Sequence, residues 1–297
     1  HFSNYDNQRS IPSVTDGFKP SQRKIFFGSE RRSLYRDEIK VSQLAGYISD
    51  QAAYHHGEVS LQMAIVSMAH DFIGSNNVNL LMPNGQFGTR DKGGKNSASA
   101  RYLFTKLNTL SSKIFRSEDK CIYSYVDDDG SKVEPVNYSP ILPMQLINGV
   151  HGIGTGYSTS IPCFNPSEIV KYILKRMSGI SFNSMDELIP WYKGFTGTIN
   201  KISDTNSFEC NGKLEIINNN TVKVTEIPIG EWTYNYKEFL NKLTVEDIKK
   251  PKKGELINNF INNSGTSKID ITIEFISGVL KDFIKKNTLK KELKLNK

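Results

Sequence analysis

The sequence predicts an α+β fold with two domains, a helical first domain and a second domain that mixes helices and strands. Apolar residues recur at helical spacing between residues 19 and 72. Residues 195–229 instead alternate apolar and polar side chains between Asn-rich turns, which is typical of antiparallel strands. The length of 297 residues is sufficient for two domains of ordinary size.

Three segments of the first domain are predicted to be helices. Residues 19–36 form a basic helix with Pro20 in its first turn, where proline is favoured. Residues 41–54 and 58–72 follow. In the third segment apolar residues fall at i, i+3, i+4, i+7, i+8 and i+11 from Leu61, so they form one buried face. The cations of the first helix that we expect to stay in solvent are Lys19, Arg23, Lys24, Arg31 and Arg32.

A glycine-rich loop follows the third helix. It opens on Pro83-Asn84-Gly85, a turn signal, and carries Arg90, Lys92 and Lys95. Three helices followed by a loop-and-strand wing describe a winged helix-turn-helix domain, which sets its third helix into a DNA major groove. We place this domain at residues 1–137.

The second domain, residues 138–297, is predicted to contain both kinds of element. Residues 141–149 are expected to form a buried strand, and residues 166–178 a helix that Pro166 opens. The strict alternation of apolar residues from Ile269 to Phe275 predicts a further strand.

Composition narrows the class of protein. The formal net charge is +7 and the pI is about 9.1, which suits a polyanionic partner and equally a lysine-rich surface without a specific partner. Cys121, Cys163 and Cys210 are too far apart for a C-x-x-C site and fit a reducing compartment. With no membrane-length apolar run and no signal peptide, we expect an intracellular protein with no membrane partner. Because the chain begins with His1, we expect it to be part of a longer protein.

Arg101-Tyr102 is the pair with the clearest chemical potential. A tyrosine hydroxyl can attack a phosphodiester and form a covalent intermediate. An adjacent guanidinium can stabilise the phosphate charge that develops during the attack. Taken alone, such a pair is far better explained as a buried aromatic residue beside a surface arginine, so the surrounding sequence has to decide.

Basic residues before this pair are candidates for binding phosphates. Arg9, Lys19 and Arg23 flank or begin the first predicted helix and could contact successive phosphates. His55 and His56 precede the third helix. Adjacent helical residues point about 100° apart, which disfavours a shared metal ion, whereas a helix N-terminus attracts phosphate.

Two further segments have alternative interpretations. The glycines between Gly149 and Gly156 resemble a dinucleotide fingerprint, but no helix is predicted after them, as that motif requires. What remains is a tight loop with Ile153 at its tip, either an apolar wedge for a DNA base step or a residue packed inward. Asp127-Asp128-Asp129 is more consistent with a solvated turn than with a metal site.

Taken together, these motifs resemble the DNA-cleavage core of type IIA DNA topoisomerases, most closely the eukaryotic-type topoisomerase II. They occur in the order and with nearly the spacing of that family, over essentially the whole chain. The segment 28–36 is slightly expanded, and Asn96 stands where the family usually has aspartate. The motifs are Arg9–Ser13, Asp16–Pro20, Tyr54–Glu58, Gly74–Asn77, Pro83–Arg90, Gly93–Lys95, Ala100–Tyr102, Lys132–Pro135, Gly152–Gly156, Ile161–Pro166 and Trp232-Thr233.

The resemblance implies a function and a set of site residues. It implies a winged-helix domain followed by an α/β tower, or shoulder, domain. Tyr102, assisted by Arg101, would attack one DNA strand and become linked to its 5′ phosphate, and Ile153 would intercalate. Two protomers of a homodimer would each cut one strand of a bent duplex for strand passage. The implied DNA-binding residues are Arg9, Lys19, Arg23, His55, His56 and Lys95.

Other parts of that family are expected outside these residues. An ATP-binding ATPase domain and a Toprim domain that holds Mg²⁺ would precede the chain, and a coiled-coil gate would follow, so we expect no metal ligands here and no cleavage by this chain alone. The location would be a eukaryotic nucleus, or the host cell or virion of a large DNA virus. The alternative is a winged-helix DNA-binding module without chemistry, or a decayed fragment.

Overall fold

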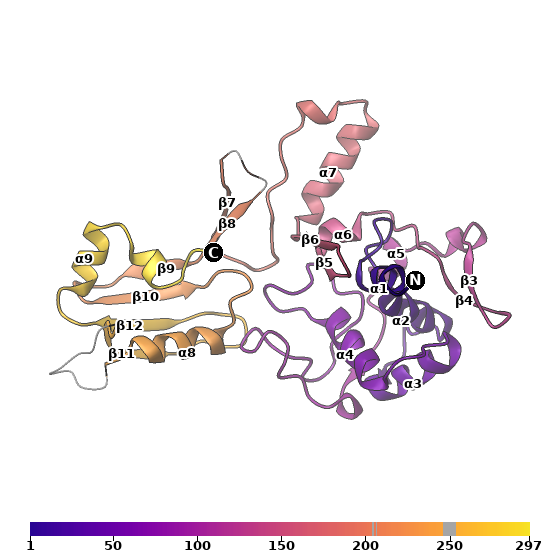
Figure 1. Ribbon diagram of the computed structural model, residues 1–297, viewed down its shortest axis with the longest axis horizontal. Helices are drawn as coiled ribbons and strands as arrows, with labels where there is room; N and C mark the ends of the chain where they lie inside the picture. Colours follow the sequence, from indigo (N-terminus) through magenta and orange to yellow (C-terminus); the bar gives the residue numbers. More distant parts are fainter. Residues whose placement is uncertain (204, 206, 246–253) are drawn as a thin grey trace. The chain divides into compact units, whose positions relative to one another are not determined.

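The computed structural model describes residues 1–203, 205, 207–245 and 254–297. The chain packs into two compact units. Figure 1 colours the chain from indigo at the N-terminus to yellow at the C-terminus. The predicted boundary between residues 137 and 138 lies inside the first unit, and as a division by function it stays a prediction. The first unit comprises residues 1–71, 75–88 and 97–193, and the second comprises residues 72–74, 89–96 and 194–297.

Helices at the start of the first unit confirm the three predicted helical segments, with earlier ends. Ser33 and Ala53 have φ angles of 55° and 47°, a left-handed conformation that ends a helix. The first helix, α1, was not predicted, because none of its residues is buried and its sequence has no apolar face. The helices are α1 (Phe2–Ser10), α2 (Pro20–Arg31), α3 (Val41–Gln51) and α4 (Glu58–Ala69).

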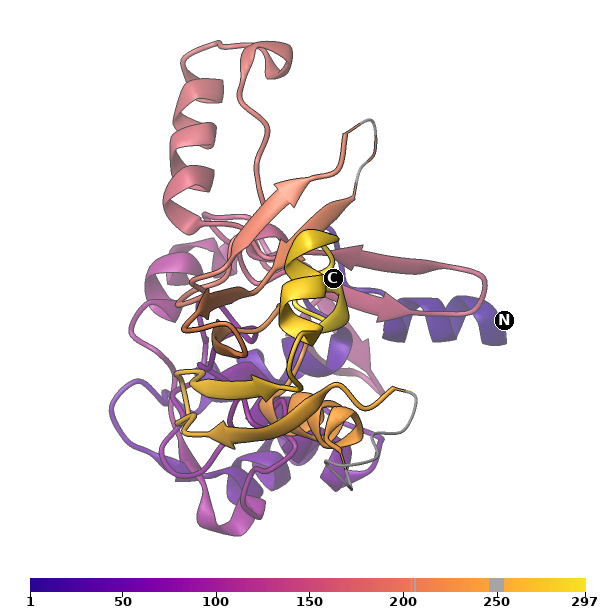
Figure 2. The same ribbon diagram turned by 90° about the vertical axis from the view of Figure 1, so that its left-hand side faces the viewer.

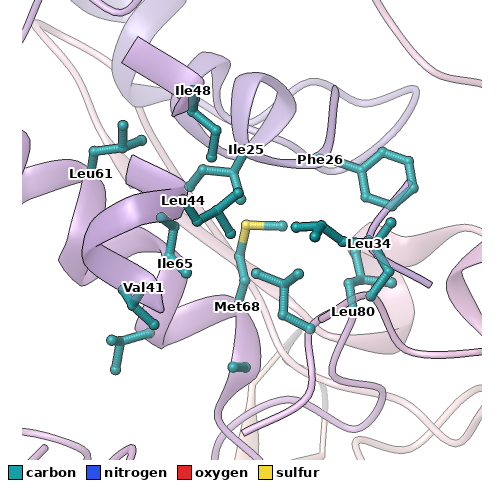
Figure 3. Close-up of a cluster of buried hydrophobic side chains, with 14 of the residues drawn as sticks. Ile25, Phe26, Leu34, Val41, Leu44, Ile48, Leu61, Ile65, Met68 and Leu80 are labelled. Atoms are coloured by element: carbon teal, nitrogen blue, oxygen red, sulfur yellow. The ribbon is translucent and has the colours of Figure 1, made fainter. Parts of the chain in front are cut away.

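The core of the first unit forms where α2, α3 and α4 meet (Figure 3). Burial of one large apolar side chain in this core stabilises the fold by about 1.5–3 kcal/mol relative to leaving it fully exposed. The predicted buried face of α4 is confirmed in Leu61, Ile65, Met68 and Ala69, whereas Phe72 lies beyond the end of the helix. The side chains labelled in Figure 3 are Ile25, Phe26, Leu34, Val41, Leu44, Ile48, Leu61, Ile65, Met68 and Leu80.

The prediction of a buried strand at residues 141–149 is wrong. The segment contains a short helix, α6 (Met144–Ile147). Pro143 precedes it with φ of −70°, close to the helical value, and Met144 and Ile147 are buried at i, i+3 spacing. A short apolar run cannot distinguish a buried strand from a buried helical turn by periodicity alone.

Short strand pairs and helices complete the first unit. The helix predicted at 166–178 is confirmed as α7 (Pro166–Met177), where the side chain of Asn165 caps the backbone N–H of Ser167. The antiparallel pairs are β1 (Ile39–Lys40) with β2 (Phe104–Thr105), β3 (Tyr125–Asp128) with β4 (Ser131–Pro135), and β5 (Val150–Ile153) with β6 (Ser158–Ile161). The short helices are η1 (Ala100–Tyr102), α5 (Ser111–Ile114), η2 (Ser117–Cys121) and η3 (Phe182–Ser184).

The second unit is built on an antiparallel sheet with strand order β11-β12-β10-β9. Figure 2 shows β11 and β12 as neighbouring gold arrows that point in opposite directions. The alternation predicted up to Phe275 is confirmed, since Ile271, Ile273 and Phe275 are buried in β12. The strands are β7 (Thr198–Lys201), β8 (Phe208–Asn211), β9 (Lys213–Ile216), β10 (Thr221–Glu226), β11 (Ile257–Asn262) and β12 (Ile271–Phe275).

Helices and one buried ion pair stabilise this second unit. Arg90 pairs with Glu226, and the backbone N–H and hydroxyl of Thr196 both donate to Glu226 Oε2 at 3.1 Å. These partners offset the cost of burying two charges. Among the residues described here, no helix is long and apolar enough to cross a membrane. The helices are α8 (Thr233–Leu243), α9 (Val279–Lys285) and α10 (Leu289–Glu292).

Candidate functional site

Tyr102 presents its side chain to solvent at the end of η1, with 65% of its surface exposed. Its backbone N–H donates to the carbonyl of Ser99 at 2.9 Å, which fixes the turn. The Cζ atom of Arg101 lies 5.1 Å from the centroid of the Tyr102 ring. An exposed hydroxyl and an exposed guanidinium therefore lie next to each other, where both can reach one phosphate group.

Rigid backbone surrounds this exposed tyrosine. Leu103 is only 1% exposed, and its carbonyl accepts the N–H of Val41 at 2.9 Å. Phe104 exchanges two backbone hydrogen bonds with Asn84, at 3.0 and 3.1 Å. The tyrosine thus lies directly before a buried anchor, so the position of its backbone is fixed even though its side chain is exposed.

Asn84 and Gly85 belong to the loop that pairs with the Tyr102 segment, and two contacts fix this loop. Gly85 has φ of 117°, and a Cβ there would lie 3.1 Å from Cδ2 of Leu103. The side-chain amide of Asn84 donates to Glu38 Oε2 at 2.5 Å. Glu38 therefore supports the Tyr102 segment through Asn84, a role that no sequence pattern indicated.

In the first unit, two of the predicted phosphate-binding cations are accessible. Arg9 is exposed in the last turn of α1. Lys19 is half-buried at the N-cap of α2, and its backbone N–H donates to the side chain of Gln22 at 2.9 Å. Both cations lie near helix ends of the first unit.

The prediction that Arg23 stays in solvent is wrong. The residue is 7% exposed, and its side chain donates from Nε and Nη2 to the two carboxylate oxygens of Asp16, at 2.8 and 3.0 Å. It also donates to the carbonyl of Phe18 at 3.1 Å. Asp16 is fully buried and accepts from the backbone of Tyr138 as well. A buried carboxylate needs a cation, and Arg23 supplies it from one turn into α2.

The prediction that Lys24 stays in solvent is also wrong. Its ammonium group lies 2.8 Å from Glu134 Oε2 and donates to the carbonyl of Ala52. Glu134 is 4% exposed, so this contact too is an ion pair that holds elements of the fold together. Two of the five cations expected in solvent on the first helix are therefore structural.

His55 and His56 are both exposed just before α4. His55 Nε2 lies 2.8 Å from Oδ2 of Asp128, the last residue of β3. The pKa of His56 is below its ordinary value because of partial burial and then the nearby positive charges of Arg9, His55 and Lys24. Cations thus gather near His56, an arrangement that favours an anionic partner.

Ile153 is exposed rather than packed inward, with 69% of its surface accessible at the end of β5. The segment after Gly156 is the strand β6, so the dinucleotide-binding alternative is excluded. Helix α1 lies against this hairpin: Asn7 donates to the carbonyl of Thr155 at 3.2 Å, and the hydroxyl of Thr155 donates to Asp6 at 2.8 Å. The helix that carries Arg9 therefore also holds the Ile153 hairpin in place.

The alternating glycines of this hairpin have a packing explanation. A Cβ at Gly152 would lie 2.4 Å from the carbonyl oxygen of Ser10, and one at Gly154 would lie 2.1 Å from Asn7 Oδ1. Only glycine lets the hairpin approach α1 so closely. The glycine spacing was the one sequence signal that could have indicated the contact, although it did not reveal α1 as the partner.

Lys95 belongs to the second unit and is exposed. Beside it, Asn96 accepts the backbone N–H of Thr89 at 3.0 Å and donates to the Thr89 hydroxyl at 2.8 Å. The asparagine that departs from the family pattern thus closes the loop that carries Lys95.

A Mg²⁺ site is not formed by the described part of the chain. It contains no cluster of three or more His, Cys, Asp or Glu side chains suited to a metal ion. In the acidic turn, Asp128 faces His55, and Asp127 accepts the backbone N–H of Gly130 at 2.9 Å. The Mg²⁺ that the resemblance implies is expected in a Toprim domain outside these residues.

The family model for the A subunit of DNA gyrase/topoisomerase IV matches residues 9–297. The chain belongs to this family. It is 51% identical over 239 residues to DNA topoisomerase 2 of Candida albicans, an alignment that covers 80% of this chain and 16% of that protein. It is 43% identical over 294 residues to DNA topoisomerase 2 top-2 of Caenorhabditis elegans, covering 99% of this chain and 19% of the relative.

A solved structure agrees with the sequence relatives. The crystal structure of the Plasmodium falciparum topoisomerase II DNA-binding, cleavage and re-ligation domain matches with a TM-score of 0.93 and 43% identity, covering 99% of this chain and 39% of that one. The match confirms the predicted α+β fold with its winged-helix and tower arrangement. The chain spans only 16% to 19% of the length of the curated relatives described here.

Proposed function

We propose that this chain is the DNA breakage-and-reunion region of a type II DNA topoisomerase, an isomerase that relaxes or decatenates DNA. The observation that carries this proposal is the exposed Tyr102 hydroxyl beside the Arg101 guanidinium, on a backbone that Leu103 and Asn84 hold rigid. The family membership supports it.

In the proposed reaction, the hydroxyl oxygen of Tyr102 attacks the phosphorus of a DNA phosphodiester. The new O–P bond links Tyr102 to the 5′ phosphate, and the bond to the 3′ oxygen breaks. The tyrosine proton passes to solvent or to a base, and the 3′ oxygen takes up a proton. Arg101 stabilises the charge on the phosphate oxygens during the attack. The same steps in reverse reseal the strand, and because the covalent bond conserves the phosphodiester energy, resealing needs no ATP.

Separate residues would hold the duplex. We assign Arg9, Lys19, His55 and His56 of the first unit to phosphate contacts, and Lys95 of the second unit to the same role. The assignment rests on charge and accessibility, since Lys19 is half-buried and the other four are exposed. Arg23 would act indirectly, because its bonds to Asp16 and Phe18 order the turn that ends at Lys19.

Ile153 would act as the wedge. An exposed apolar side chain at the tip of a hairpin can enter a base step and kink the duplex. The contacts of Asn7 and Asp6 with Thr155 would keep the hairpin from yielding when the base step opens.

The complete reaction would need parts outside these residues. We propose that a Toprim domain supplies the Mg²⁺ ligands, that an ATPase domain binds ATP, and that two protomers act as a homodimer on double-stranded DNA. Residues 1–137 would be the winged-helix domain with the tyrosine, and residues 138–297 the tower domain. The site of action would be a nucleus, or the host cell or virion of a large DNA virus.

The second candidate function is a winged-helix DNA-binding module without chemistry. It accounts for the positive charge but not for an exposed tyrosine on a rigid backbone beside an exposed arginine. The distinguishing experiment is Tyr102→Phe in the full-length parent protein, assayed for relaxation of supercoiled DNA. We expect activity to disappear while DNA binding persists. The control is Tyr234→Phe, an exposed tyrosine of the second unit, which should keep full activity. Retained relaxation in Tyr102→Phe would favour the non-catalytic module.

A further inference from the structure

A small cavity of about 160 Å³ opens in the first unit between α2 and the segment that runs from η2 to β4. Four of the eight residues that line it are aromatic. The rings of Tyr123 and Tyr138 meet edge to face with centroids 5.5 Å apart. The residues that line the cavity are Phe27, Glu30, Arg31, Lys120, Tyr123, Tyr125, Pro135 and Tyr138.

Glu30 places a carboxylate in this aromatic cavity with few partners. Its side chain is 8% exposed. Within the described part of the chain, long contacts reach Oε1: the hydroxyl of Tyr35 at 3.4 Å and the ammonium of Lys120 at 3.6 Å. Burial raises the pKa of Glu30, and the charge of Lys120 offsets this only in part. A buried carboxylate is costly unless strong donors reach it, so this group still has capacity for a partner.

The hydroxyl of Tyr138 is a second polar group in the cavity, in contact with Glu30. The residue is 2% exposed, and its hydroxyl meets the Glu30 carboxylate without the geometry of a normal hydrogen bond, a contact that lowers the pKa of Glu30 and raises that of Tyr138. Buried polar groups nearly always find a partner of good geometry. A hydroxyl and a carboxylate whose contacts are all long or poorly aligned therefore leave a place for a further polar ligand.

The chemistry of the cavity selects the ligand. Aromatic faces attract cations through their quadrupoles, and a carboxylate accepts charge-assisted hydrogen bonds from an ammonium group. A primary ammonium has three donors, enough for Glu30 and Tyr138 together. We propose that this cavity binds a primary alkylammonium group, supplied either by a protein lysine side chain or by a small free polyamine. This inference does not rest on the proposed function.

Lys120 is the chain's own competitor for the site. Its side chain extends from η2 to the mouth of the cavity and is 50% exposed, so its ammonium is only partly desolvated at 3.6 Å from Glu30. This distance is too long for a strong hydrogen bond. A ligand ammonium would displace it, and removing the Lys120 charge should therefore tighten ligand binding.

The test is a titration of the chain with n-propylammonium, followed by NMR shifts of the tyrosine ring protons. We expect saturable shifts, and no saturation at equal concentrations of 1-propanol, which matches the ligand in size but lacks the charge. Two further arms use an N-acetyl-lysine amide and spermidine. The ligand that binds more tightly identifies a protein lysine or a polyamine as the source of the ammonium group.

Variants make the test specific. Glu30→Gln should weaken binding about tenfold or more, Tyr138→Phe several-fold, and Lys120→Gln should tighten it several-fold. Glu118→Gln, at an exposed carboxylate on the same short helix, is the matched control and should change nothing. Equal binding of 1-propanol, or no tightening in Lys120→Gln, would overturn the proposal. Lys120 is half exposed, so that variant remains informative even where Glu30→Gln does not fold.

Discussion

Arg23 and Arg101 occupy similarly basic stretches of the sequence, yet their environments are opposite. Arg23 is 7% exposed and donates two hydrogen bonds to the carboxylate of Asp16. Arg101 is exposed, and its guanidinium lies over the ring of Tyr102. The difference shows that a cation in a basic stretch of this sequence is either held in the fold or left accessible to a ligand, according to whether a buried carboxylate lies within its reach.

The largest expected effect is on stability at Arg23. In Arg23→Ala the buried Asp16 loses its cation, so we expect the free energy of unfolding to fall by about 3–5 kcal/mol. Denaturant titration of the chain measures it. Arg31→Ala, at an exposed cation of the same helix, is the control and should change stability by less than about 0.5 kcal/mol. Equal stability of the two variants would remove the contrast with Arg101.

Arg101→Ala should show the opposite pattern, with loss of activity at unchanged stability. Removing one charge-stabilising group from a transition state costs about 10²–10³-fold in rate. We expect a loss of that size in DNA cleavage by the full-length parent, with the same unfolding midpoint as the unaltered protein. A stability loss comparable to that of Arg23→Ala would show that Arg101 is structural too.

Gly152→Ala tests the support of the Ile153 hairpin. The added Cβ would meet the Ser10 carbonyl oxygen at 2.4 Å, so the hairpin must move away from α1. Overpacking of this kind costs about 1–3 kcal/mol. We also expect a smaller DNA bend angle by fluorescence energy transfer. Gly46→Ala, whose added Cβ would have no described atom within 4 Å, should leave the bend unchanged.

The smallest effect concerns pH and His56. Its pKa in the free protein lies below the ordinary value because of burial and neighbouring cations. A bound phosphate would raise that pKa, so the complex takes up a proton, and DNA affinity should increase as the pH falls from about 8 to about 6. His56→Gln should flatten this dependence in binding titrations. The stability of the free protein should depend on pH in the opposite direction. Because the pKa of His56 is lower in the folded than in the unfolded chain, its contribution to the free energy of unfolding decreases as the pH falls through the unfolded-state pKa of about 6.5. An unchanged pH dependence in the variant would exclude His56 as the titrating contact.

The sequence predicted those elements whose apolar residues recur over enough positions to fit the period of a helix or that of a strand, but not both. The alternation that ends at Phe275 and the helical face around Leu61 are confirmed. The short apolar run 141–149 was misassigned because Met144 and Ile147 suit a strand or a helical turn equally. Helix α1 has no apolar face, so the glycine spacing of the hairpin pointed to a close contact without revealing α1 as the partner.

The candidate site divides in the same way. Tyr102 and Ile153 were found from their motifs, and the structure shows both to be exposed. Arg23 is buried because it pairs with Asp16. The two residues are near in sequence, but the burial of Asp16 is seen only in the folded chain. Glu38 and Asn84 meet across 46 positions of sequence, and local patterns contain no information on such long-range pairs.

The role of Tyr102 as the nucleophile is best tested by peptide mapping of a trapped cleavage complex. The full-length parent would be denatured during reaction with 3′-labelled or uniformly labelled DNA and then digested, and the nucleotide-bearing peptide would be identified by mass spectrometry. We expect a 5′-phosphotyrosine on Tyr102 and on no other tyrosine. A linkage on another residue, or no covalent peptide at all under conditions where DNA is cleaved, would contradict it.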